Sequence, residues 1–149
     1  DWVSASLSRQ SLLEIDVEDS AHLIMGFKSA SSRGQLIATL SLDFIRQDLT
    51  RYCVAIGDEG SLRWDGVKGQ VSVLEKGESE WKVLFTSELS NEKTYLSEWL
   101  TFIDRVNSLT VPSEQGQEEI RVMEVVESAR LSSKRKAQIS VSEIRGMNW

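Results

Sequence analysis

The chain has 149 residues, of which 40% are hydrophobic and 27% are charged, and its formal net charge is −6. This length and composition are typical of one globular domain with a single core, and they exclude a largely disordered chain. The negative charge argues against nucleic acid as a partner, because most of the surface would repel a phosphate backbone. No apolar run approaches the ~20 residues that cross a bilayer, so no membrane partner is expected either.

Cys53 is the only cysteine and His22 the only histidine. No intrachain disulfide can form, which favours a cytoplasmic protein. A His/Cys metal cluster is excluded for the same reason, and no glycine-rich dinucleotide fingerprint occurs. We therefore expect no metal ligand, no cofactor-binding residue and no catalytic residue in this chain. Cys53 is interpreted as a small buried hydrophobe, and His22 as an interior or interface histidine bonded to a local acceptor.

Alternation of apolar and polar residues predicts a series of β-strands. The predicted strands cover residues 2–9, 21–27, 35–44, 52–56, 61–64, 70–75 and 81–85, with a short return at 138–141. The most regular is 35–44, in which Leu36, Leu40 and Leu42 lie on one face and Thr39, Ser41 and Asp43 on the other. We expect the apolar face to be buried, and the polar face to meet solvent, a ligand or a partner subunit.

Gly57 and Gly60 bracket two acidic residues between the strands at 52–56 and 61–64. This spacing predicts a hairpin with Gly60 at the left-handed position of a bulged turn. A phosphate-binding loop is disfavoured, because no Lys-Ser or Lys-Thr pair follows the glycines.

The period changes to that of a helix in the last third of the chain. We predict amphipathic helices at about 91–109 and 114–133, separated by Pro112 and with Ser113 capping the second. The cations at 134–136 suit the negative end of that helix. Strands followed by helices predict an α+β fold: one domain, 1–149, with an open, mainly antiparallel sheet of about six strands and two long C-terminal helices packed on one face.

Asp43, Arg46 and Arg51 cluster where the strand at 35–44 passes to the strand at 52–56. Carboxylate and guanidinium groups at one place could hold a polar or anionic ligand. The alternative is a set of surface ion pairs, which are common and contribute little to stability.

Four passages carry a resemblance to a known family. They are VEDSAHLIMGF at 17–27; RYCVAIGDEGSLRWD at 51–65; Tyr95, Glu98 and Phe102 in YLSEWLTFID; and Pro112, Gly116, Glu127-Ser128-Ala129 and Ser132-Ser133. In this order they resemble the C-terminal domain of the Gfo/Idh/MocA family, which includes glucose-fructose oxidoreductase and inositol dehydrogenase. One departure is Glu118-Glu119, where the family usually carries Asp-Gly.

The resemblance implies a domain of an NAD(P)-dependent oxidoreductase that acts on a sugar, a sugar nucleotide or a cyclitol. In that family NAD or NADP is bound by an N-terminal Rossmann domain, which this chain, beginning at Asp1, does not contain. The resemblance therefore implies a fragment that is not catalytic alone. It implies a homo-oligomer formed through a sheet face and a substrate wall, for which Asp43, Arg46, Arg51 and Tyr95 are candidates. The alternative is a stand-alone ligand-binding or dimerisation scaffold with no enzymatic activity.

Overall fold

The computed structural model describes residues 1–28, 34–87, 91–108 and 115–146. It divides into two compact units, one formed by Asp1–Arg46 with Pro112–Trp149 and the other by Gln47–Val111. The elements are β1 (Trp2–Ser8), β2 (Ser20–Lys28), β3 (Gln35–Asp43), β4 (Tyr52–Gly57), β5 (Gly60–Asp65), β6 (Gln70–Glu75), β7 (Lys82–Thr86), α1 (Asn91–Ser108), α2 (Gln115–Arg135), β8 (Ile139–Ser140) and α3 (Val141–Arg145).

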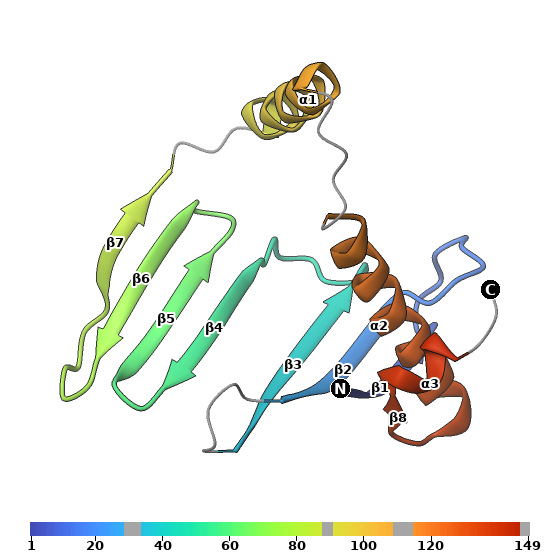
Figure 1. The fold of residues 1–149 in the computed structure, drawn as a ribbon. Coiled ribbons are helices and arrows are strands. Elements are labelled where there is room, and N and C mark those ends of the chain that lie inside the picture. Colours follow the sequence, from blue (N-terminus) through green and yellow to red (C-terminus); the bar gives the residue numbers. More distant parts are fainter. Residues whose placement is uncertain (29–33, 88–90, 109–114, 147–149) are drawn as a thin grey trace. The chain divides into compact units, whose positions relative to one another are not determined.

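The first unit is a four-stranded antiparallel sheet, in the order β3-β2-β1-β8, with α2 packed on β1 (Figure 1). The residues of β1 alternate, so that Val3 faces α2 while Trp2 and Ser4 face the other side. Val3 and Leu23 form the buried core with Ala129 of α2. This core joins segments that are far apart in the sequence, and it fixes which side of the sheet is the interior.

One edge of β1 is closed partly by a strand and partly by a helix. β8 pairs only with Trp2 and Val3. Further along the same strand, the Ala5 N–H donates to Ser132 Oγ at 2.9 Å and the Leu7 N–H donates to Ser133 Oγ at 3.0 Å. The two serines of α2 thus take the place of a neighbouring strand, and the backbone donors of β1 are satisfied without one.

The apolar face of β3 is exposed, against the expectation that it would be buried. Leu36 is 59% exposed and Leu42 is 56% exposed. Leu40 and Leu42 lie opposite Leu23 and Ala21 of β2, and these two β2 residues belong to the buried core or pack against it. A helix is about 10 Å across and strands are about 4.8 Å apart, so one helix covers about two strands. α2 packs on β1, and the core that it forms reaches Leu23 of β2, whereas β3 extends past this core.

The second unit contains an antiparallel meander in the order β4-β5-β6-β7. Its first hairpin pairs Gly57 with Gly60 across a two-residue turn, without the predicted bulge. Gly60 has a φ of +152°, outside the left-handed helical position that was predicted. Its role is close approach: a Cβ at this position would lie 2.4 Å from the Leu74 carbonyl oxygen of β6. Both glycines therefore serve the turn and the strand pairing.

The prediction of one sheet of about six strands, with both long helices on one face, is wrong. The described residues form eight strands in two four-stranded sheets, and β3 and β4 belong to different sheets. The individual strands and the two long helices lie close to their predicted ranges, whereas Pro112 and Ser113 lie outside the described residues. Alternation defines a strand and its two faces, but it does not say which strand forms hydrogen bonds with it.

Candidate functional site

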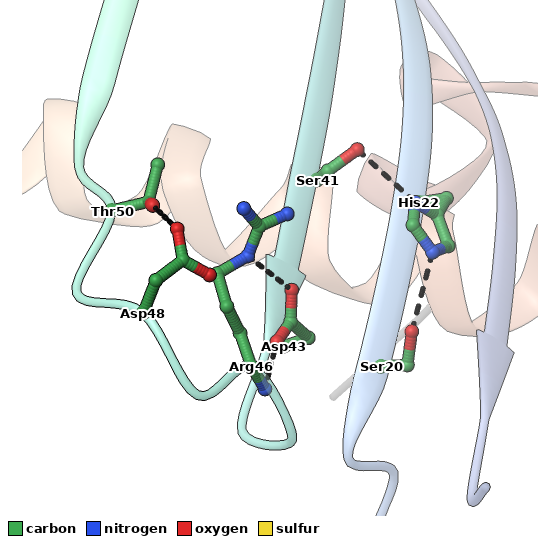
Figure 2. Close-up of polar contacts among 7 residues, drawn as sticks. All are labelled: Ser20, His22, Ser41, Asp43, Arg46, Asp48 and Thr50. Atoms are coloured by element: carbon green, nitrogen blue, oxygen red, sulfur yellow. Dashed lines mark hydrogen bonds and ion pairs between the residues drawn. The ribbon is translucent and has the colours of Figure 1, made fainter.

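Asp43 and Arg46 form an ion pair at the end of β3. The Arg46 backbone N–H donates to Asp43 Oδ1 at 2.8 Å, and Arg46 Nε lies 3.5 Å from Asp43 Oδ2. The turn that follows the strand places the two side chains together, as Figure 2 shows. The Arg46 side chain is 50% exposed and the Asp43 side chain 18% exposed. The pair therefore presents a carboxylate acceptor and a guanidinium donor side by side, which is a suitable combination for a hydroxyl-bearing or anionic ligand.

A row of hydrogen bonds crosses from β2 to β3 beside this pair. His22 Nε2 lies 3.2 Å from Ser20 Oγ, and His22 Nδ1 lies 3.1 Å from Ser41 Oγ, the residue opposite His22 in the register (Figure 2). The prediction of an interior position for His22 is wrong, because its side chain is exposed. The prediction that it bonds a local acceptor is consistent with this geometry. Both ring nitrogens have a hydroxyl partner in either tautomer, because a hydroxyl can donate or accept.

These residues belong to the side of the first sheet that faces away from α2, which we call the hydroxyl face. Its residues follow from the register of the three strands. They are Trp2, Ser4, Ser6 and Ser8 of β1, Ser20, His22, Ile24, Gly26 and Lys28 of β2, and Gln35, Ile37, Thr39, Ser41 and Asp43 of β3. The face combines small hydroxyl side chains with a few apolar ones.

Arg51 has a different environment, in the second unit. Its guanidinium carbon lies 5.3 Å from the centroid of the Trp64 ring. Gly66 makes this arrangement possible, since a Cβ there would come within 2.8 Å of the Trp64 ring. The Gly66 N–H also donates to the Arg51 carbonyl oxygen at 2.7 Å. Arg51 is thus held over an aromatic face, where a cation is favoured.

Tyr95 lies on α1 in an aromatic patch. With Glu98, Trp99 and Phe102 it lines a recess along one face of the helix. The rings of Trp99 and Phe102 meet edge to face, with centroids 5.7 Å apart. The residues share this face because they are three or four positions apart. The recess therefore follows from helix periodicity.

The structure brings Asp43 and Arg46 together as the sequence predicts, and it gives Arg51 and Tyr95 separate neighbours in the second unit. The row Ser20–His22–Ser41 was not predicted. Alternation placed Ser41 on the polar face, but the pairing with His22 depends on the register of two strands. Cys53 was predicted to be buried and is exposed, as are all six residues of β4.

Two buried carboxylates of the first unit were also missed. Asp19 accepts the Gln10 N–H at 2.9 Å and the Ser11 N–H at 2.7 Å. The hydrogen bond from the Ser11 side chain, together with these amides, lowers the pKa of Asp19 against the opposing effect of burial. The Glu124 carboxylate binds Arg145 of α3 through two hydrogen bonds, which lower the pKa of Glu124. Both carboxylates have structural partners that account for their burial.

The described residues do not fit a nicotinamide cofactor. Dinucleotides bind where parallel strands alternate with helices, at a glycine-rich turn that opens a helix. All strand pairs in the described ranges are antiparallel. No group of three or more His, Cys, Asp or Glu side chains suited to a metal ion occurs in the same part of the chain. We therefore assign no reaction step to these residues.

None of the helices described here is long and apolar enough to cross a membrane.

Comparison with known proteins identifies a fold relationship. No family model matches the chain, and no curated protein matches it. Among solved structures, it is similar to an oxidoreductase from Sinorhizobium meliloti, with a TM-score of 0.67 and 17% sequence identity. The match covers 94% of this chain but 46% of that protein, so the chain spans less than half of its length. The chain thus shares the fold of one part of an oxidoreductase.

Proposed function

We propose that this chain is the C-terminal substrate-binding and oligomerisation domain of an NAD(P)-dependent oxidoreductase of the Gfo/Idh/MocA type, a cytoplasmic enzyme acting on a sugar, a sugar nucleotide or a cyclitol. The observation that supports the proposal best is the match of 94% of the chain to 46% of a solved oxidoreductase. A domain that corresponds to part of an enzyme need not contain that enzyme's cofactor site. This agrees with the antiparallel sheets, which offer no dinucleotide crevice among the described residues.

In this proposal the chain binds and orients, and does not itself carry out redox chemistry. NAD or NADP, held by another domain, would supply the ring that accepts or donates the hydride. Asp43 can accept a hydrogen bond from a substrate hydroxyl, and Arg46 beside it can donate one. Arg51, stacked on Trp64, is a second candidate donor, and Tyr95 is a candidate hydroxyl contact on α1.

The first test is cofactor binding by the 149-residue chain, measured by calorimetric titration with NADH and NADPH. We expect no specific binding, and micromolar affinity would contradict a cofactor site outside the chain.

The second test is the reading frame that precedes Asp1. A glycine-rich Rossmann fingerprint followed by a Glu-Lys-Pro motif is expected there. A start codon immediately before Asp1 would favour the stand-alone scaffold instead.

The substrate class can be tested on the chain directly. Ligand-observed NMR with a panel of sugars, sugar nucleotides and cyclitols should detect weak binding that decreases in Asp43→Asn and in Arg46→Gln. Asp16→Asn is a suitable control, because Asp16 is an exposed acid of the same unit that lies outside the predicted site. Equal binding by all four proteins would contradict the assignment of Asp43 and Arg46 to the substrate wall.

A further inference from the structure

We propose that the recess on α1 lined by Tyr95, Glu98, Trp99 and Phe102 binds the quaternary ammonium group of a small soluble ligand. This inference goes beyond the proposed function and does not depend on it. Three features of the described residues support it: the arrangement of the rings, the charge beside them, and the absence of a cation over Trp99.

The three aromatic residues form a row along α1, at spacings of four and three residues. Tyr95 is 66% exposed, Trp99 62% and Phe102 56%, so each side chain is open to a ligand. The rings of Trp99 and Phe102 are inclined at 77° and form two adjacent walls of a corner. Aromatic walls of this kind enclose quaternary ammonium groups, because the face of each ring is negative. The volume of the recess, about 390 Å³, is within the range of small-ligand sites.

The row is aromatic although packing alone does not require rings. The neighbouring row of the same helix, one residue further along the chain, has the same spacing and is entirely aliphatic: Leu96, Leu100 and Ile103. Aromatic residues make up 7% of the chain but three of the eight residues from 95 to 102. Aliphatic side chains are sufficient to pack a helix face. The concentration of rings in one row therefore favours a ligand that is recognised by ring faces.

Glu98 adds a full negative charge to the recess. It has no ion-pair partner among the residues that the structure describes. A cation is therefore attracted by this carboxylate as well as by the rings, and the net charge of −6 acts in the same direction. A sugar fits this recess less well. Its hydroxyls need several hydrogen-bond partners, whereas the side chains here offer the Tyr95 hydroxyl and the Glu98 carboxylate, and a quaternary ammonium group needs none.

Two other tryptophans of the second unit already have a cation over the ring. Arg51 lies 5.3 Å from the centroid of Trp64, and Arg63 lies 4.6 Å from that of Trp81. Trp99 has Phe102 as its ring partner, and no arginine or lysine lies over it in the described part of the chain. Its face therefore remains available to a cation from solution.

The test is an NMR titration of the isotope-labelled 149-residue chain with choline, followed at the indole N–H signals. We expect the Trp99 signal to shift with a Kd in the millimolar range, because an exposed cation–π contact is weak. The Trp64 and Trp81 signals should not shift, since arginines already cover these rings. The matched ligand is the uncharged analogue in which a tert-butyl group replaces the trimethylammonium group. It should bind at least about fivefold more weakly than choline.

Variants are compared by saturation transfer to the methyl protons of choline. Trp99→Leu and Glu98→Gln should each weaken binding at least about threefold. Asp104→Asn is the control, because Asp104 is an acid of the same helix that does not line the recess, and its binding should equal that of the wild type. Tyr95→Phe keeps the ring and should also bind choline. This variant separates the ammonium site from the hydroxyl contact that the proposed function gives to Tyr95.

Three outcomes would overturn the inference. The first is equal binding of choline and its uncharged analogue, which would show that the recess is only apolar. The second is a Trp99 signal that does not move at choline concentrations far above the millimolar range. The third is binding to phosphatidylcholine vesicles without binding of free choline, which would identify a lipid surface as the partner of α1. The cofactor and substrate experiments do not use this recess, so its failure and the failure of the proposed function are distinguishable.

Discussion

Ser132 in α2 accepts a hydrogen bond from the backbone N–H of Ala5 in β1, at 2.9 Å across 127 residues of sequence. The same hydroxyl donates to the Ala137 carbonyl oxygen at 2.6 Å, just beyond the end of the helix. Ser132 is 1% exposed, so its two hydrogen bonds are shielded from solvent. One buried hydroxyl therefore holds the edge of a strand and the end of a helix together.

Ser132→Ala should destabilise the chain by roughly 1–3 kcal/mol, because it leaves the Ala5 N–H without an acceptor. Ser128→Ala is a matched control in the same helix. Ser128 is equally buried, but its hydroxyl donates to the Glu124 carbonyl oxygen of the preceding turn, within the same helix. Urea unfolding of both variants measures the difference. Equal free energies of unfolding would contradict the role assigned to Ser132.

Arg145→Lys should loosen α3 from α2. Arg145 Nε and Nη2 bind the two oxygens of Glu124 at 2.7 and 2.8 Å, and a lysine cannot reproduce this two-pronged contact. Hydrogen exchange at Ile144, which is buried in α3, should become faster. Arg130→Lys is the control, since Arg130 pairs with Glu127 on the surface of α2. Unchanged exchange at Ile144 in the Arg145 variant would show that the pair does not hold α3.

Asp19 should make the stability of the chain depend on acid pH. Its pKa is lowered in the folded state, first by the Ser11 side chain and then by backbone amides. A lowered pKa contributes stability above the ordinary aspartate pKa of about 3.9, and this contribution is lost as the pH falls below that value. Asp19→Asn should therefore have a lower Tm at pH 7, with a gap to the wild type that narrows as the pH falls below about 4. A gap that stays constant would contradict the assignment. Asp16→Asn provides the matched control.

Lys136→Gly should stabilise the chain by about 1 kcal/mol, because a residue with a Cβ is strained in the left-handed region. Lys136 has a φ of 54°, and the Ala137 N–H beyond it donates to the Ser132 carbonyl oxygen at 3.3 Å. This is the usual way in which a glycine ends a helix. Thermal unfolding of Lys136→Gly and of the neighbouring Lys134→Gly separates relief of strain from loss of charge. Only Lys136→Gly should raise the Tm.

The strand faces and the helices could be predicted from the sequence alone. Alternation in 35–44 placed Leu40 on one face of the strand and Thr39 and Ser41 on the other, and the register confirms that separation. The change of period after residue 90 identified α1 and α2 close to their observed bounds. The acid–base pair Asp43–Arg46 was also predictable, because its members are three residues apart and a turn brings them together. These features depend on neighbours in the sequence, which is why local pattern is sufficient.

Tertiary structure alone decided which strands share a sheet, which strands α2 covers, and which polar side chains meet. Ser132 and Ala5 are 127 residues apart, and His22 meets Ser41 only because two strands pair in one register. Alternation is the same for a strand in either sheet, so it could not separate β3 from β4. Alternation also could not show that β3 extends past the helix, because the burial of a strand depends on the width of the element that packs on the sheet. The sequence therefore determined the faces of each element, and long-range pairing determined which faces became core, edge or surface.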